Sequence, residues 1–365
     1  MKKLEDYLKY EQPTKYIVDS EKYSNEYDIP VLTAGKSFIL GYTNEKNNIF
    51  PKEELPVIIF DDFTTDCKYV DFPFKVKSSA MKILRPINNA NAKFLYYYMK
   101  NIRFDSTLHK RYWISEYSQL SIKELNSKMQ DEFANKMQKL EKLIELKNKQ
   151  LQECNNLIKS QFVEMFGTNK KSKYPFDSLE NLTLKITDGK HGGCKGEKKS
   201  GYYFVGATEI YNDKINYQTA KEITKTDFEK DYKRCDLKNN DFVIVNTGAT
   251  IGKSAIVNTD LADHTLLQKS VALIRTKQEL INTIYLKYCY DANPDMYNKG
   301  NGCARINLLL SQIKETMIPV PPIELQNKFA MIVEQIDKQK FVNANLLQLL
   351  VKNLKRCYNN IIGFR

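Results

Sequence analysis

Residues 129–134 read Met-Gln-Asp-Glu-Phe-Ala, and residues 325–330 read Leu-Gln-Asn-Lys-Phe-Ala. The second stretch lies 196 residues after the first, and the register holds without a gap until Phe166-Gly167 corresponds to Ile362-Gly363. Each copy is almost free of Gly and Pro and is apolar at steps of three and four residues, which is typical of a long helix with one apolar stripe. A repeat this far apart predicts that each half of the chain is one globular segment followed by one long helix.

Each apolar stripe needs a partner to cover it, so we expect the helices, residues 129–165 and 325–361, to pair. Each stripe is broken at its midpoint by a polar residue, Lys147 in the first helix and Asn343 in the second. Midpoints meet in an antiparallel pair, so these two side chains are expected side by side, where they would set the register. Two unrelated core helices are the alternative, but the gap-free match over 37 residues favours a duplication. The predicted seam consists of Met137, Ile144, Lys147, Leu151, Ile158, Val333, Ile336, Asn343, Leu347 and Leu354.

The length of 365 residues and an apolar content of 42% predict two globular domains plus connectors. We place the domains at residues 1–124 and 168–322, and the long helices with their connectors at 125–167 and 323–365. Both domains combine short strands with helices, so the predicted fold class is α+β, with an antiparallel coiled coil and pseudo-two-fold symmetry.

The first domain is expected to contain strands at 29–32, 37–40, 57–60, 70–74 and 80–84, with helices at 3–9 and 93–100. The second is expected to contain strands at 241–245, 254–257 and 270–274 and a helix at 281–290. Both domains close on Ile-Lys-Glu, at residues 122–124 and 313–315. We therefore interpret them as distant copies that have diverged in their side chains.

The net charge of +12 is spread along the chain, so it is not the property of one basic tail. Basic folded domains favour a polyanionic partner, although a Lys-rich proteome would give the same sum. Seven cysteines without a C-x-x-C pair indicate reduced thiols in a cytoplasm and no structural zinc. The sequence shows no secretory leader and no run of 18 apolar residues, which predicts a protein that is neither secreted nor membrane-spanning.

The motifs for chemistry are incomplete. Residues 248–254, Gly-Ala-Thr-Ile-Gly-Lys-Ser, resemble a nucleotide-binding loop but have three residues between the glycines, where four are required. We interpret them as a tight turn between strands, with Lys253 free to reach a phosphate. Asp61, Asp62 and Asp66 with Lys68 resemble a metal-dependent nuclease cluster, but their separation is too short, so capping of turns is favoured.

The histidines, His109, His191 and His264, have no partners in a recognisable catalytic setting, and no methyltransferase motif is present. No cofactor and no metal are therefore predicted, and the chain is expected to carry no catalytic activity.

These features together resemble the specificity subunits of type I restriction–modification systems. The resemblance covers nearly the whole chain and is carried by the two helix repeats, the Ile-Pro-Val-Pro-Pro lead at 318–322, and the stretches 30–43, 58–63 and 248–253. The first helix departs from the family pattern, because Leu-Asn-Ser-Lys at 125–128 replaces the proline-rich lead.

The resemblance implies two target-recognition domains at opposite ends of an antiparallel helical pair, each reading half of a split site in double-stranded DNA. It also implies two methyltransferase subunits as partners, with restriction or translocase subunits able to join. A helix of this length spans about 55 Å at 1.5 Å per residue. B-DNA turns every 34–36 Å or so, and helix length would therefore set the spacer between half-sites.

Loops rich in Lys, Arg, Ser, Thr and Gly are the expected readers, because phosphate contacts position a protein on DNA and base-edge contacts specify sequence. Each of these residues also has the alternative of being an ordinary surface charge. A coiled-coil adaptor that binds only proteins is the rival function, and a nucleotide-driven enzyme that uses Lys253 is a third. The candidate DNA contacts are Lys36, Tyr42, Lys68, Lys77, Ser78, Lys110 and Arg111 in the first domain and Lys190, His191, Lys195, Thr247, Lys253 and Arg305 in the second.

Overall fold

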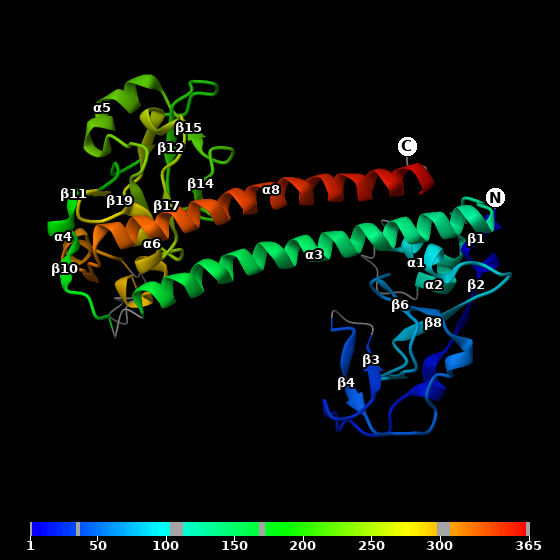
Figure 1. Cartoon of the computed structure of the whole chain (residues 1–365). Coiled ribbons are helices and arrows are strands. Elements are labelled where there is room, and N and C mark those ends of the chain that lie inside the picture. Colours follow the sequence, from blue (N-terminus) through cyan, green and yellow to red (C-terminus); the bar gives the residue numbers. More distant parts are fainter. Residues whose placement is uncertain (1, 34–36, 103–111, 168–171, 298–306, 363–365) are drawn as a thin grey trace. The chain divides into compact units, whose positions relative to one another are not determined.

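The structure, a computed structural model, describes residues 2–33, 37–102, 112–167, 172–297 and 307–362. The chain divides into two compact units, the first formed by residues 1–149 and 344–365 and the second by residues 150–343. Two 40-residue helices, α3 (Ser127–Phe166) and α8 (Ile323–Ile362), each contribute one part to each unit (Figure 1). Both helices begin and end within two residues of the positions expected from the repeat.

Local signals explain the ends of α3. Asn126 precedes its first turn, and the Asn126 Oδ1 atom accepts a hydrogen bond from the amide of Met129 at 2.9 Å. This is an N-cap, which satisfies one of the free amides at a helix start. Gly167 follows the last turn at φ 76°, and its amide donates to the carbonyl of Val163. A glycine in the left-handed region is a common helix stop.

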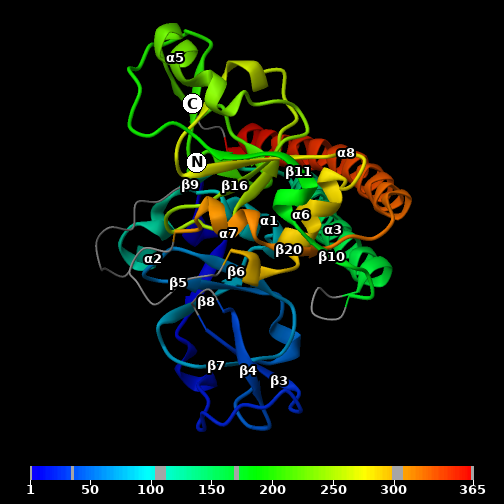
Figure 2. The same cartoon turned by 90° about the vertical axis from the view of Figure 1, so that its left-hand side faces the viewer.

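Unit 1 contains a four-stranded sheet in the order β2-β8-β5-β6 and a three-stranded sheet in the order β4-β3-β7. Figure 2 shows β3, β4 and β7 together at one end of this unit, with β5, β6 and β8 next to them. A further short pair, β1-β9, lies where the domain meets α3. The elements are β1 (Lys2–Lys3), β2 (Leu8–Glu11), β3 (Ile29–Leu32), β4 (Ile39–Thr43), β5 (Val57–Asp61), β6 (Cys67–Val70), β7 (Lys75–Val76), β8 (Met81–Pro86), α1 (Ala92–Lys100), α2 (Tyr112–Ser115) and β9 (Ser121–Ile122).

Unit 2 repeats this topology. Its four-stranded sheet has the order β11-β19-β16-β17, its three-stranded sheet the order β15-β12-β18, and β10-β20 is the short pair next to α8. The elements are β10 (Phe176–Ser178), α4 (Leu179–Leu182), β11 (Thr183–Asp188), β12 (Tyr203–Val205), β13 (Ile210–Tyr211), β14 (Lys214–Ile215), β15 (Lys221–Glu222), α5 (Lys225–Cys235), β16 (Phe242–Val245), β17 (Ser254–Ile256), β18 (Thr265–Leu267), β19 (Val271–Thr276), α6 (Thr283–Asp291), α7 (Leu310–Lys314) and β20 (Met317–Pro319).

The pairing directions also agree between the units. The centre of each small sheet is a parallel pair, β3 with β7 in unit 1 and β12 with β18 in unit 2. Each large sheet is antiparallel throughout. The two domains are therefore copies of one fold.

Two local expectations were wrong, and one helix was not expected. Residues 3–9 form a 3-10 turn at Leu4–Asp6 followed by strand β2, because Leu8 pairs with Pro86. Residues 70–74 leave the sheet after Val70, and Phe74 stacks on Phe50 with ring centroids 4.8 Å apart. Helix α5 was not anticipated, because its sequence is mostly charged.

Each unit packs its domain against an antiparallel pair formed by α3 and α8. In unit 1 the start of α3 meets the end of α8, where the rings of Phe133 and Tyr358 lie 6.2 Å apart. In unit 2 the end of α3 meets the start of α8, where the rings of Phe162 and Phe329 lie 5.5 Å apart. The expected antiparallel packing is thus present in both units.

The predicted seam residues differ in burial. Met137, Ile158 and Val333 are buried in the domain cores, and Asn343 is 9% exposed. Asn343 and Lys147 belong to different units, so their juxtaposition stays a prediction. The remaining predicted seam residues, which are half-buried, are Ile144, Lys147, Leu151, Ile336, Leu347 and Leu354.

Candidate nucleic-acid interface

Two loops of unit 2 leave its large sheet at the same end. Asp188, the last residue of β11, pairs with Ala272, and Val245, the last residue of β16, pairs with Val271. The amides that follow continue this arrangement on both sides of β19: Gly189 donates to the carbonyl of Val271 at 3.2 Å and Asn246 to that of Ser270 at 3.0 Å. The predicted contacts Lys190, His191, Thr247 and Lys253 therefore gather at one edge of the domain.

The loop after β16 is the tight turn that the sequence suggested. The amide of Val245 donates to the carbonyl of Lys253 at 2.8 Å, and strand β17 follows instead of a helix. The φ angles of Gly248 and Gly252 are 102° and 97°, a region that disfavours side chains. A Cβ on Gly252 would lie 2.8 Å from the ring of Tyr297, whereas one on Gly248 would meet nothing within 4 Å. The turn is thus open on the outside, with the Lys253 side chain exposed.

The loop after β11 is held to α5 by charge. Lys190 forms an ion pair with Asp231, and only 15% of the Lys190 side chain is exposed. The hydrogen bond to Asp231 raises the pKa of Lys190. The amide of Lys195 donates to Asp227 Oδ2 at 2.6 Å, so the same helix fixes the middle of the loop. Lys190 and Lys195 are therefore brought together against α5, and Lys190 is already partly neutralised.

The His191 side chain reaches solvent although it has a carboxylate neighbour. Its side chain is 57% exposed, and its Nε2 atom lies 3.8 Å from Asp188 Oδ2. Asp188 in turn forms an ion pair with Arg234 of α5. The imidazole therefore stands at the sheet end beside a carboxylate that already has a partner, and it can reach outward.

Unit 1 gathers a smaller set at the equivalent end of its large sheet. Lys77 and Ser78 lie in the connection between β7 and β8, and Lys68 lies in β6 opposite Ile59. Lys77 forms an ion pair with Glu21, and Lys68 Nζ lies 2.9 Å from Asp66. Each of these cations therefore has a carboxylate partner, which lowers the free positive charge at this end.

Tyr42 is not part of that group. It pairs with Pro30 in the β3–β4 hairpin, near the end opposite the turn, and its carbonyl accepts a hydrogen bond from Ser24. Its assignment as a DNA contact is therefore the least supported of those that the structure describes. Four further candidates, which lie outside the described residues, are Lys36, Lys110, Arg111 and Arg305.

The carboxylates of the 61–66 turn serve the backbone. Asp61 Oδ1 accepts hydrogen bonds from the amides of Phe63 at 2.9 Å and Thr64 at 3.3 Å. Asp62 Oδ1 accepts one from the amide of Trp113 at 2.8 Å. This confirms the expectation that they cap turns. No cluster of three or more metal-ligating side chains occurs among the described residues.

One polar group at the unit 2 edge was missed by sequence reasoning. Asn246 is 4% exposed, and its Oδ1 atom has no hydrogen-bond partner within the described part of the chain. Its amide and carbonyl are both used, by Ser270 and by Leu308. Only its place directly before the Thr247–Lys253 turn could have drawn attention to it. The side chain is a further candidate for contact at this edge.

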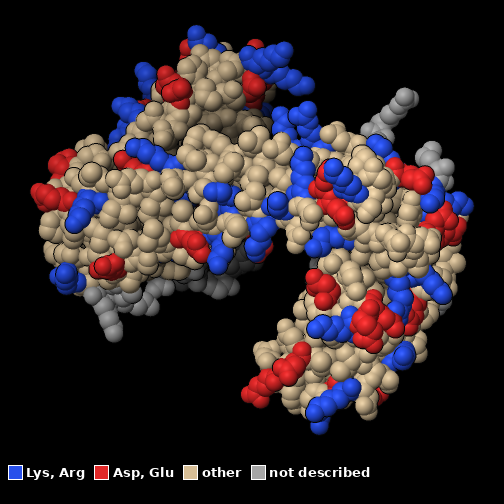
Figure 3. Space-filling model, turned by 45° about the vertical axis from the view of Figure 1, so that its right-hand side comes forward, with Lys and Arg blue, Asp and Glu red and all other residues tan. Residues whose placement is uncertain are grey.

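Charge alone does not outline the interface. On the face drawn in Figure 3, Lys and Arg side chains lie among Asp and Glu side chains instead of forming one patch of a single sign. The candidate site is therefore defined by loops and their geometry, with charge as a contribution.

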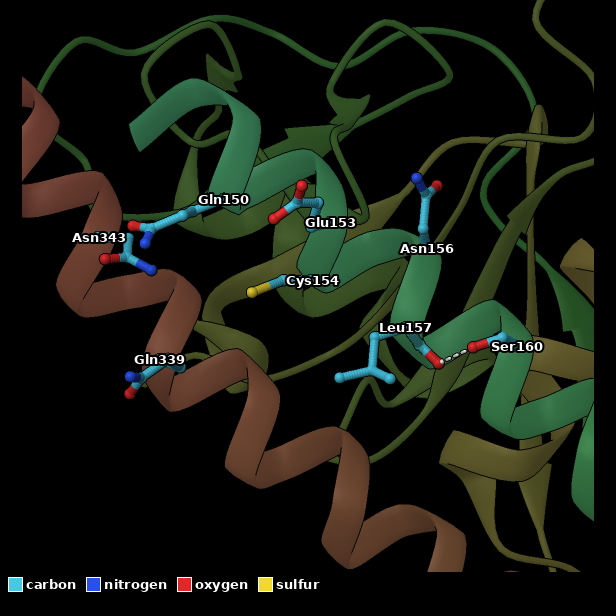
Figure 4. Close-up of a pocket in the computed structure, with 8 residues that line it drawn as sticks. All are labelled: Gln150, Glu153, Cys154, Asn156, Leu157, Ser160, Gln339 and Asn343. Atoms are coloured by element: carbon cyan, nitrogen blue, oxygen red, sulfur yellow. Dashed lines mark hydrogen bonds between the residues drawn. The ribbon is translucent and has the colours of Figure 1, made fainter. Parts of the chain in front are cut away.

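A second candidate surface is a groove between the helices of unit 2. It has a volume of about 610 Å³ and is lined by α3 and α8 residues that include Cys154, Leu157, Gln339 and Asn343. Figure 4 shows Cys154 and Leu157 pointing from α3 toward α8, with Gln150 and Asn343 facing one another. The lining is mixed polar and apolar, as is common where a second protein docks.

Known proteins resemble this chain in sequence. Residues 189–351 match the family described as the type I restriction modification DNA specificity domain. The chain is 54% identical over 123 residues to the EcoR124I/EcoR124II specificity subunit of Escherichia coli, which covers 33% of this chain and 30% of that protein. It is 25% identical over 203 residues to the EcoBI specificity subunit of the same organism, which covers 53% and 41%. The chain thus matches 30% and 41% of the length of these curated relatives.

Two solved structures share the fold over nearly the whole chain. The S subunit of a type I restriction–modification system from M. genitalium aligns with a TM-score of 0.61 at 16% identity, over 99% of this chain and 95% of that one. A chain from a study of complex assembly and conformational transition of the type I system aligns with a TM-score of 0.54 at 12% identity, over 98% and 97%. Residues in the second half of the chain match the type I specificity domain, and the chain shares the fold of the M. genitalium S subunit. The resemblance inferred from the helix repeats is therefore confirmed.

Proposed function

We propose that this chain is the DNA specificity subunit of a type I restriction–modification system. Its two domains read the halves of a bipartite site in double-stranded DNA, and it directs two methyltransferase subunits, with restriction subunits where they are present, to that site. The chain itself is not an enzyme and uses no cofactor. A cytoplasmic location follows from this role, and the free cysteines among the described residues agree with it.

The observation that carries this proposal is the repeated strand order of the sheets, to which unit 2 adds the β13-β14 pair and helix α5. Each unit has one large sheet, one small sheet and one antiparallel helix pair in the same order, yet the loops at the sheet ends differ in length and charge. Identical scaffolds with different loops are suited to reading two different sequences in the same way, since specificity comes from side chains that reach base edges.

The helices offer a place for the methyltransferase subunits. In unit 1, Leu143, Leu146, Leu346 and Leu349 are between 38% and 52% exposed, at helical spacing on α3 and α8. In unit 2 the exposed apolar residues include Phe341 and Val342, at 65% and 60%. Exposed apolar stripes of this kind mark protein contacts. We propose that they bind the modification subunits.

The test is to map methylated motifs in cells with and without the gene, with the chain and its modification subunits expressed together. We expect a bipartite motif that depends on the gene and has an unread spacer of fixed length. A gel shift with random duplex DNA distinguishes the rival protein-only adaptor, which would bind the modification subunits without retaining DNA.

Among the described residues, every helix is too short or too polar to span a membrane.

A further inference from the structure

A glutamine near the start of each long helix makes the same set of hydrogen bonds in both units. Gln130 of α3 and Gln326 of α8 correspond through the 196-residue repeat. In unit 1, Gln130 Oε1 accepts a hydrogen bond from the amide of Asn91 at 3.1 Å, and Gln130 Nε2 donates to the carbonyl of Leu125 at 2.9 Å. The Gln130 side chain is 8% exposed, so both ends of a buried amide are satisfied.

Unit 2 repeats these two contacts and adds a third. Gln326 Oε1 accepts from the amide of Asn282 at 2.9 Å, and Gln326 Nε2 donates to the carbonyls of Pro321 at 2.8 Å and Leu280 at 3.2 Å. Pro321 precedes its glutamine by five residues, as Leu125 does in unit 1. Gln326 is fully buried.

The asparagine in each set begins a helix of the recognition domain. Asn91 Oδ1 accepts from the amide of Phe94 and caps α1, and Asn282 Oδ1 accepts from the amide of Ile284 and caps α6. Each asparagine also donates its side-chain amide to the residue after the glutamine. Asn91 Nδ2 lies 2.5 Å from Asp131 Oδ1, and Asn282 Nδ2 lies 2.9 Å from Asn327 Oδ1. We call each Gln–Asn set a clamp, because it joins a domain helix to a long helix through two side chains.

The clamp and the candidate DNA contacts lie at opposite ends of one strand. In unit 1, β8 begins at Met81, three residues after Ser78, and ends at Pro86, five residues before Asn91. A six-residue strand is ~20 Å long. A rotation of about 10° at the clamp would therefore move the far end by about 3.5 Å, which is close to the ~3.4 Å between successive bases on a strand. A small change of angle is enough to shift the reading edge by one base pair.

We propose that Gln130 with Asn91, and Gln326 with Asn282, are positioning residues that fix the angle of each recognition domain on its long helix and so hold the unread spacer to one length. The effect on the spacer rests on the proposed DNA-reading function. The clamp itself rests on contacts within each unit, and it can be tested without DNA.

The difference between Asp131 and Asn327 supplies a sharp experiment. Asn91→Asp keeps the cap on α1, since aspartate is as good an N-cap as asparagine. It removes the donor to Asp131 and places two carboxylates in contact. Asn282→Asp makes the same change in unit 2, but Asn327 can turn its amide and donate, because the two ends of an amide are interchangeable in shape.

The readout is the set of spacer lengths methylated from a library of sites that differ only in the spacer. We expect Asn91→Asp to raise methylation of neighbouring spacers relative to the preferred one about tenfold, which corresponds to about 1.4 kcal/mol, because a hydrogen bond to a charged carboxylate is replaced by two carboxylates in contact. Asp131→Asn in the same chain should restore the single spacer, and Asn282→Asp should have a smaller effect. A single spacer in Asn91→Asp, or no rescue by Asp131→Asn, would overturn the proposal.

A measurement within unit 1 separates this inference from the proposed function. Spin labels on unnatural residues at the exposed positions Glu53 and Lys139 report the distance between the domain and α3. Asn91→Asp should broaden that distance distribution, and an unchanged width would refute the clamp whether or not the chain reads DNA. If the wild type methylates no bipartite site while the width responds, the proposed function fails and the clamp stands.

Matched controls exclude a general loss of stability. Gln138 accepts a hydrogen bond from Lys93 at 3.1 Å between the same two helices, but Gln138 is exposed whereas Gln130 is buried. Gln138→Leu should leave the spacer and the distance width unchanged, and a broadening there would show that any loss between α1 and α3 suffices. Gln130→Leu removes the hydrogen bond between Gln130 and the amide of Asn91. It should broaden both the set of methylated spacers and the distance distribution, even if Asn91→Asp expresses poorly.

Discussion

The two units use one scaffold but treat the centre of its large sheet differently. In unit 1, Asp62 follows the last paired residue of β5 and lies 3.5 Å from Lys82, with both side chains at most 4% exposed. The same two places in unit 2 hold Asn246 and Ala272, a neutral amide and a methyl group. The backbone role is kept, since the carbonyls of Asp62 and Asn246 accept from Tyr112 and Leu308. The two units thus share their strand register. They differ in that the buried ion pair of unit 1 is replaced in unit 2 by two neutral side chains.

The largest expected effect comes from breaking that pair on one side. Lys82→Ala leaves a buried carboxylate without its cation, which costs about 3–5 kcal/mol. Hydrogen exchange should show the loss as faster exchange of the β5 and β8 amides, with the β16 and β19 amides of unit 2 as the internal reference.

A double variant tests whether the unpaired carboxylate of Asp62 causes the loss of stability. Asp62→Asn with Lys82→Ala gives unit 1 the pair that unit 2 already has, and the amide of Trp113 keeps an acceptor. We expect most of the protection to return. If the amides of the double variant exchange as fast as those of Lys82→Ala, the neutral pair of unit 2 is not an equivalent replacement for the ion pair.

A second contrast concerns the arginine near the end of each central strand. Arg275 donates from Nε and one terminal nitrogen to the two oxygens of Asp241 at 2.7 and 2.8 Å, and the Asp241 side chain is 2% exposed. Arg85 of unit 1 pairs with Glu11 and Glu54, which are 31% and 40% exposed. Arg275→Lys should therefore cost about 2–3 kcal/mol and Arg85→Lys about 1 kcal/mol or less. Equal losses, measured by the same exchange experiment, would contradict this ranking.

DNA affinity should also respond unequally. Lys253 is exposed and has no ion pair within the described ranges, whereas Lys190 is engaged with Asp231. If both contact phosphate, Lys253→Ala should weaken binding about fivefold to tenfold for all sequences and reduce the salt slope by about one. Lys190→Ala should have a smaller effect on affinity. Titration at several salt concentrations measures both, and an unchanged slope for Lys253→Ala would remove that residue from the interface.

The smallest expected effect is a loss of stability of unit 2 at low pH. Burial alone would raise the pKa of Asp236, but the hydrogen bonds and charge of Arg275, with Lys238 and Lys185, hold it below the ordinary value of 3.8. A lowered folded-state pKa contributes stability above the unfolded-state value, and this is lost as pH falls through the folded-state pKa. Exchange protection around β19 should therefore decline below about pH 4, and Arg275→Lys should flatten the decline. No change in the pH profile would show that the Arg275–Asp236 contact contributes nothing.

The sequence located the long helices well because their signal is repeated. Phe133 and Phe329, in register 196 residues apart, are both buried where each domain meets its helix pair. The strand at 57–60 and the helix at 93–100 were also placed, since a continuous apolar run and a helical pattern need little context.

Features set by tertiary contact were not predictable. Strand β2 looked helical until its pairing with β8 is known, and helix α5 has too few apolar residues to show a stripe. The roles of Gln130 and Gln326 were missed although both stand in the repeated stretch, because a polar residue on a helix normally faces solvent. The candidate DNA contacts stay predictions, and the sequence could not show that Lys68, Lys77 and Lys190 already have carboxylate partners.

The most direct test of the account is to insert one heptad into both long helices at matching places. Seven residues lengthen a helix by about 10.5 Å, which corresponds to about three base pairs of duplex. The account predicts that methylated sites keep both half-sequences while the unread spacer grows by about three base pairs. An unchanged spacer in a chain that still folds and methylates would contradict it.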